Sequence, residues 1–207
     1  MEKISGRQSS PIRPISEVRK MNVPIDISTV TLKTARLVLR PWKKADLQDF
    51  YTYASVEGVS EMAGLTAPKD LEECRQILDS FIDGKKTLAL EYQGKVIGSF
   101  AIAKYSEEHY PELASLSGRE IGYVLSKDYW GQGLMPEAVK AVSQYLFETV
   151  KLDFILVGHF AQNKQSARVI EKCGFEHIKT FPHTTRYGTV ETSEESILYR
   201  SHFPGEA

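Results

Sequence analysis

The fold is decided by one stretch of sequence, residues 120–138, which reads EIGYVLSKDYWGQGLMPEA from Glu120 to Ala138. It begins with strand-like alternation, turns at Gly131 and Gly133, and continues as a helix with Pro136 in its first turn. Glycines allow a sharp turn and a close approach of the backbone to a ligand. Because the first N–H groups of a helix lack internal partners and carry partial positive charge, this turn is suited to a phosphate or diphosphate.

The same turn can also be a simple connection, and it matches neither of two known phosphate-binding fingerprints. A third glycine of the dinucleotide-binding type is missing, since Pro136 and Glu137 stand where it would fall. No Gly-Lys-Ser or Gly-Lys-Thr follows, which excludes a P-loop. The ligand class therefore depends on the surrounding sequence.

Hydrophobic periodicity on either side of this stretch predicts a mixed α/β domain. The Gln93-Gly94 dipeptide is typical of a hairpin turn between two strands. Because three strands follow one another before the glycine turn, the order favours a mixed sheet over a purely parallel one. The expected strands are 37–39, 87–92, 95–105, 119–126, 154–157, 175–181 and 196–200, and the expected helices are 43–54, 70–84, 134–149 and 163–172.

The first 30 residues differ from the rest of the chain. Pro11, Pro14 and Pro24 interrupt any helical or strand period there. We expect residues 1–30 to be a flexible or loosely docked tail and residues 31–207 to form one domain. Met21 is an alternative natural start.

Composition narrows the classes of function. The 207 residues are 42% hydrophobic and 26% charged, as expected for a globular domain, and the formal net charge is -1. This charge balance predicts neither a nucleic-acid partner nor an anionic membrane partner. With two cysteines, no apolar run of roughly 20 residues and no secretory signal, we expect a reduced, cytoplasmic protein. His159, His177 and His183 lack the spacing of metal ligands, so no metal is expected.

Three blocks of sequence resemble the GNAT superfamily of N-acetyltransferases, and in particular its ribosomal-protein N-terminal acetyltransferase branch. The first block is Thr34-x-Arg36-Leu-x-Leu-Arg-Pro-Trp42, and the second is the Tyr-Trp-Gly-Gln-Gly-Leu-Met run that ends at Met135. The third block, Asn163-x-x-Ser-x-Arg-Val-x-Glu-Lys-x-Gly-Phe175, completes the order over residues 31–200.

The resemblance implies a strongly twisted mixed sheet of about six to seven strands with flanking helices, whose two central strands splay apart. Acetyl-CoA is the implied cosubstrate. Its pantetheine arm would add to the edge of the strand 121–126, which contains Val124 and Ser126. Asn163 would contact acetyl-CoA from the next helix, although a helix cap is an equally simple role for this residue. The diphosphate would lie on the amides of Gly131, Gln132, Gly133, Leu134 and Met135.

Acetyl transfer needs a base for the amine, a donor for the thioester oxygen and an acid for the leaving thiolate. Glu120 is the candidate base, because some superfamily members carry a catalytic glutamate on this strand; an exposed strand-end carboxylate, with a water chain as base, is the alternative. Ser166 is the candidate acid and cofactor contact, and its alternative role is that of a helix-capping serine. The backbone N–H of Val124 is the candidate oxyanion donor.

These features predict an enzyme that acetylates a primary amine by direct attack in a ternary complex. The N-terminal amine of a protein is the acceptor that the resemblance implies. Small amines such as polyamines, amino acids or antibiotics use the same fold, and a non-catalytic acyl-CoA-binding module is the alternative of another class. The chain is expected to act as a monomer or homodimer.

Overall fold

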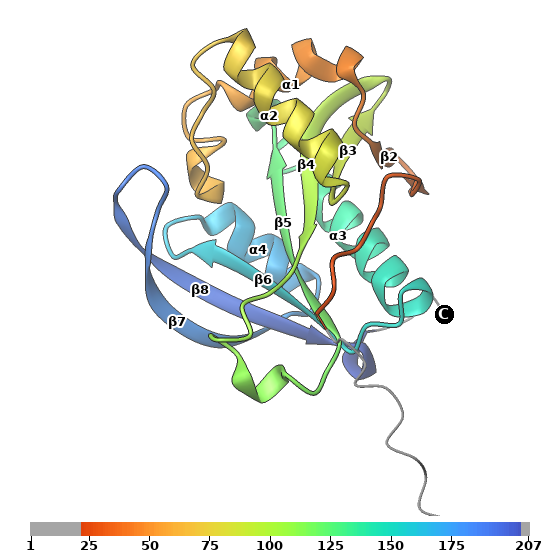
Figure 1. Cartoon of the computed structure of the whole chain (residues 1–207), viewed down its shortest axis with the longest axis vertical. Coiled ribbons are helices and arrows are strands. Elements are labelled where there is room, and N and C mark those ends of the chain that lie inside the picture. The colour runs from red at the N-terminus through yellow and green to blue at the C-terminus, as the bar shows by residue number, and fades with distance from the viewer. Residues whose placement is uncertain (1–21, 204–207) are drawn as a thin grey trace, which may run out of the picture.

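The computed structural model describes residues 22–203 (Figure 1). Apart from one short additional strand at the start, the order of strands and helices is the predicted one. The strands are β1 (Leu32–Lys33), β2 (Leu37–Pro41), β3 (Thr87–Tyr92), β4 (Lys95–Ala103), β5 (Gly118–Leu125), β6 (Phe154–Phe160), β7 (Glu176–Thr184) and β8 (Val190–Tyr199). The α-helices are α1 (Leu47–Ala54), α2 (Leu71–Gly84), α3 (Leu134–Gln144) and α4 (Lys164–Lys172), and the 3-10 turns η2 (Glu61–Ala63) and η3 (Pro111–Leu113) lie in loops.

All eight strands form one sheet in the order β1-β2-β3-β4-β5-β6-β8-β7. The predicted α/β class is correct, and the sheet has one strand more than the expected six to seven. The additional strand is β1, which is two residues long and pairs with β2 through Leu32↔Leu39 and Lys33↔Val38. Two residues are too few to show any alternation in the sequence.

The centre of the sheet is open. Among the described strands, β5 and β6 are the parallel neighbours, and they pair only from Gly118↔Phe154 to Ile121↔Val157. Beyond this point β5 continues along β4 to Leu125, and β6 continues along β8 to Phe160. The two strands therefore diverge like a V, as Figure 1 shows, and the predicted splay is confirmed.

Two apolar layers cover the sheet. On one face, α3 and α4 pack on a core that includes Ile121 and Val157, whereas α1 and α2 pack on the other face against Val124. Side chains alternate along a strand, so β5 contributes to both layers. A smaller cluster joins Leu113 of η3 to Leu156 of β6.

The local turns largely follow the sequence. Gln93 and Gly94 have φ of 52° and 79°, as a two-residue hairpin turn requires, and Tyr92 pairs with Lys95. Asp70 caps α2 by accepting a hydrogen bond from the Glu73 amide over 2.8 Å.

Two elements differ from their predicted bounds. The helix expected over 134–149 changes to a π-helical turn at Tyr145–Thr149, which apolar spacing does not reveal. The last strand begins at Val190 and not near residue 196. Its first half was not predicted, because the β7–β8 hairpin projects from the domain (Figure 1) and its exposed residues show no apolar alternation.

The predicted tail, residues 1–30, lies mostly outside the described residues, so the boundary at residue 31 stays a prediction. In the described part, Ile27 is buried in the main core and its amide donates to the Lys85 carbonyl over 2.8 Å. Asn22 Nδ2 donates to the carbonyl of Tyr105. Within residues 22–203, no helix has the length and apolarity to cross a bilayer.

We predict that Gly98→Ala lowers the free energy of unfolding by about 3 kcal/mol, because the added methyl group would collide with backbone atoms that cannot move away. A Cβ at Gly98 would lie 2.3 Å from the Val124 carbonyl oxygen on β5. Urea unfolding measures the change. Gly122→Ala on β5 is the matched control, since no atom lies within 4 Å of its added Cβ, and equal unfolding of both variants would contradict the assignment.

Candidate active site

A cleft of about 410 Å³ opens where β5 and β6 separate. The cleft is lined from both faces of the sheet, because the gap passes between the strands. Side chains of α4 and the start of α3 lie on one side, and residues before α2 lie on the other. The walls include Val59, Met62, Glu120, Gly122, Tyr123, Trp130, Gly131, Gly133, Leu134, Met135, Gly158, His159, Asn163, Ser166, Arg168 and Lys172.

Pairing with β4 decides which amides of β5 face the gap. The Ser126 amide donates to the Ile97 carbonyl over 2.8 Å, so it points toward β4. Alternate residues of an antiparallel strand turn their amides to the same neighbour, so Val124 also points toward β4 while Tyr123 and Leu125 face the gap. Trp130 Nε1 donates to the Leu125 carbonyl over 2.8 Å. The open edge therefore consists of the Tyr123 backbone and the Leu125 amide.

Two predicted site residues are not brought to the cleft. Val124 packs with the α1–α2 layer and Ser126 is buried, and neither lines the cavity. Whether the even or the odd residues of β5 turn their amides toward the gap depends on the register with β4, which the sequence of one strand does not specify. Tyr123 and Leu125 take their place at the open edge.

The glycine turn joins the open edge of β5 to helix α3. Gly131 and Gly133 have φ of 76° and 75°, a conformation that favours glycine. Gly133 is the N-cap of α3 and no side chain caps this helix, so the amides at its start are open to a ligand. A Cβ on Gly131 would meet nothing within 4 Å, so the space beside this residue is open. Leu134 and Met135 bury their side chains in the core and contribute only backbone.

A charged brace holds this turn from outside. Arg36 Nη1 donates to the Gln132 carbonyl over 2.9 Å, and its Nε donates to Glu137 Oε2 over 2.7 Å. Glu137 also accepts the amide of Arg36 over 2.9 Å and the hydroxyl of Thr34 over 2.5 Å. These bonds hold the pKa of the Glu137 carboxyl below its ordinary value although burial opposes them. The turn is thus fixed to the start of β2.

Helix α4 begins at the opposite wall. Asn163 accepts the Ser166 amide through Oδ1 over 3.0 Å, so it is the N-cap that the sequence allowed. Its Nδ2 donates to the Met62 carbonyl over 3.1 Å, which ties α4 to η2. Asn163 also lines the cleft, and a cofactor contact for it stays a prediction.

The Ser166 hydroxyl forms a hydrogen bond with a residue that was not predicted from the sequence. The Tyr123 Oη and Ser166 Oγ atoms lie 2.9 Å apart, with Ser166 buried at the cleft wall. Burial raises the pKa of Tyr123 above its ordinary value, although the hydrogen bond to Ser166 opposes this, so its hydroxyl stays protonated. The signal was present, because the odd residues of β5 face the α3–α4 side where Ser166 lies.

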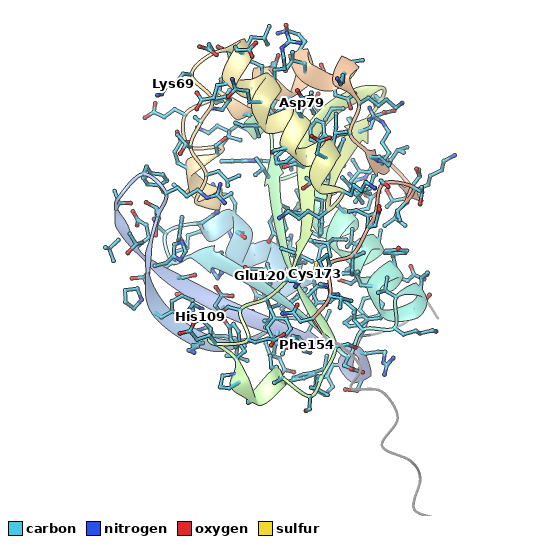
Figure 2. The ribbon with its side chains drawn as sticks, viewed as in Figure 1. Lys69, Asp79, His109, Glu120, Phe154 and Cys173 are labelled. Carbon is cyan, nitrogen blue, oxygen red and sulfur yellow. The ribbon has the colours of Figure 1, made fainter. Side chains whose placement is uncertain are left out.

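Glu120 lies at the other side of the same gap, near the middle of the molecule (Figure 2). Among residues 22–203 no hydrogen-bond donor reaches its carboxyl. Burial, with a smaller contribution from the charge of Glu195, raises the pKa of Glu120 to about 7. A carboxyl with this pKa is suited to accept a proton near neutral pH. No cluster of three metal-ligating side chains occurs in the described part of the chain.

Comparison with known proteins agrees with this geometry. Residues 36–176, more than half of the chain, match the acetyltransferase (GNAT) domain. The chain belongs to the GNAT family. It is therefore an acyl-CoA-dependent N-acetyltransferase, and its relatives include N-acetyltransferases by name.

Individual GNAT relatives are distant. The FsC-acetyl coenzyme A-N(2)-transacetylase of Aspergillus fumigatus is 25% identical over 157 residues, which cover 73% of this chain and 67% of that protein. The uncharacterized N-acetyltransferase p20 of Bacillus licheniformis is 26% identical over 154 residues, covering 70% and 82%. Among solved structures, RimJ of Mycobacterium smegmatis in complex with CoA-disulfide superposes with a TM-score of 0.71 at 16% identity, covering 86% and 90%. This likeness concerns the fold.

We predict that Arg36→Met raises the dissociation constant for CoA about tenfold, because the Gln132 carbonyl and Glu137 lose their shared charged partner. Isothermal titration with CoA measures the change. Lys33→Met on β1 removes an exposed positive charge nearby and is the control. If both variants bind CoA equally well, the brace does not position the turn.

Proposed function

We propose that this GNAT enzyme transfers the acetyl group of acetyl-CoA to a primary amine, and that the N-terminal amine of a protein is its acceptor. The observation that carries the proposal is the open edge of β5, which residues 126–133 connect to the uncapped start of α3. An extended amide-containing arm can pair with that edge, and a diphosphate can bind the helix start. Acetyl-CoA has both groups in that order.

Support for a protein acceptor comes from proteins that share the fold. A ribosomal-protein-S5-alanine acetyltransferase from Vibrio fischeri superposes with a TM-score of 0.64 at 18% identity, covering 85% of this chain and 100% of that one. The blocks around Trp42, Gly133 and Asn163 resemble the same branch. A small-molecule amine is the second candidate, because the name of the transacetylase relative of Aspergillus fumigatus specifies an N(2) atom and names no protein acceptor.

The residues divide between two sides of the gap. When bound, acetyl-CoA supplies the acetyl group, and the amides of Gly131, Gln132, Gly133, Leu134 and Met135 hold its diphosphate. The Tyr123 backbone and the Leu125 amide pair with the arm. One of these two β5 amides donates to the thioester oxygen as charge develops on it, which is the role first predicted for Val124.

Proton transfer uses the two sides separately. Glu120 removes one proton from the ammonium form of the acceptor, so the nitrogen lone pair can attack the thioester carbon. The carbon–nitrogen bond forms and the carbon–sulfur bond breaks. The hydroxyl pair of Tyr123 and Ser166 gives a proton to the departing sulfur and regains one from the acylated nitrogen. Glu120 then releases its proton to solvent.

We predict that Glu120→Gln lowers kcat/KM at least about 100-fold, because the amide cannot accept the proton. Free-thiol release from acetyl-CoA with a panel of peptides and small amines measures turnover and names the acceptor. In the wild type, kcat/KM rises with pH through about 7, where Glu120 ionises, and this limb disappears in the variant. Glu148→Gln, on the distant π-turn, is the control.

Two outcomes of that assay would contradict the proposal. Wild-type protein that binds CoA but releases no thiol with any amine would indicate a binding module. Unchanged turnover in Glu120→Gln would return the base role to a water chain.

We predict that Ser166→Ala and Tyr123→Phe each lower kcat at least about tenfold while the KM for acetyl-CoA changes little. Both remove a proton route to the sulfur and leave the backbone contacts in place. Because the two hydroxyls share one hydrogen bond, the double variant is expected to lose less than the product of the single losses. Steady-state kinetics separates the effects, and full activity in both single variants would exclude the pair as acid.

A further inference from the structure

Gly158 is the first residue of β6 beyond its last pair with β5, and a carboxyl from the neighbouring strand lies above it. Gly158 pairs with Glu195 of β8. A Cβ added to Gly158 would lie 2.4 Å from Glu195 Oε1 and 2.9 Å from its carboxyl carbon. The Glu195 carboxyl therefore does not stand over its own strand. It reaches across β6 toward the gap, and only glycine leaves room for it.

Glu120 projects from the same face of the sheet. It pairs with Leu156 of β6, and Leu156 pairs with Ile197 of β8. Residues that face each other across neighbouring strands place their side chains on the same face, as do residues two apart on one strand. Gly158 lies two residues beyond Leu156, so the position that the Glu195 carboxyl covers is a diagonal neighbour of Glu120, roughly 7–8 Å away between backbone positions.

We propose that Glu195 is a positioning residue of the acceptor site, where its carboxylate and that of Glu120 form an anionic pair that selects amines lacking a neighbouring carboxylate. This inference rests on the proposed acetyl transfer. Glu195 acts through Glu120 and through its charge. The acceptor arrives as an ammonium ion that the pair attracts, and Glu120 takes the proton. A carboxylate attached next to the amine is repelled, so a peptide N-terminus is favoured over a free amino acid.

The surroundings decide which carboxyl ionises first. Both are raised in pKa chiefly by burial. Glu195 accepts a hydrogen bond from Ser193 Oγ over 3.2 Å, and His109 and His183 also favour its charged form. No comparable donor reaches Glu120 within residues 22–203. Glu195 is therefore ionised while Glu120 still holds a proton, and this charge helps to keep Glu120 protonated up to a higher pH.

The other polar and charged groups near the pair lie on β7, on η3 and on the residues just before η3. The Tyr110 hydroxyl lies near Glu195 and lowers its pKa, without outweighing burial. The ring of Tyr110 carries Lys179 Nζ 5.2 Å from its centroid, and Glu112 acts on the same tyrosine. His109 is seen toward the β7–β8 side of Glu120 in Figure 2. Lys179 pairs with Glu195 across β7 and β8, and its Nζ donates to the His109 carbonyl over 2.9 Å.

Glu195→Gln tests the pair through two readouts. Carbon-13 NMR of the labelled glutamate carboxyls follows the titration of Glu120 without any turnover, and its midpoint is expected to fall by about one pH unit. The second readout is kcat/KM for alaninamide divided by that for alanine. Comparing this ratio between wild type and variant cancels the different basicities of the two amines. The ratio is expected to fall about tenfold.

Glu194→Gln is the matched control, because Glu194 is adjacent on β8 and faces the other side, 3.3 Å from His159 Nε2. It is expected to leave the Glu120 midpoint in place. If Glu195→Gln does not fold, Ser193→Ala weakens the ionisation of Glu195 and moves the Glu120 midpoint in the same direction by less. An unchanged midpoint and ratio, with normal wild-type turnover, would overturn the pair. Absence of wild-type turnover would instead overturn the proposed function and, with it, the acceptor preference, while the titration still reports on the coupling.

Discussion

The site depends on one constraint of hydrogen bonding, which is that β5 and β6 cannot follow both of their neighbours at once. Each strand remains paired on its outer side, β5 with β4 and β6 with β8, and the twist of the sheet separates them after Ile121 and Val157. An interior strand edge with unpaired amides is costly unless water or a ligand satisfies it. The gap therefore exposes an unpaired strand edge inside the sheet. Around it lie the glycine turn, the anionic pair of Glu120 and Glu195, and the hydroxyl pair of Tyr123 and Ser166.

Much of this architecture was readable from residues. The turn at Gly131 and Gly133 marked the junction between a strand and a helix, and the three blocks that resemble the GNAT superfamily implied the splayed sheet. Glu120 was placed on a strand and Ser166 in the first turn of a helix, as the structure has them, because alternation and helix position are local properties. These are the features that a short stretch of chain determines by itself.

What the sequence did not provide depends on register between distant segments. The choice of Tyr123 and Leu125 over Val124 requires the pairing of β5 with β4, which one strand alone does not specify. Glu195 carried no signal, because its role follows from lying opposite Gly158 on another strand. The strand β1 and the outer half of β8 were missed because exposed or very short strands have no apolar pattern.

The hydrogen bond from Asn163 to the Met62 carbonyl joins the first turn of α4 to η2, and both residues line the cleft. A large substrate that pushes η2 outward would therefore strain the first turn of α4, because the Ser166 amide donates a hydrogen bond to the same Asn163 side chain. A ligand bound on the η2 side of the gap would then change the affinity for a ligand bound on the α4 side. Thermodynamic reciprocity makes this coupling equal in both directions.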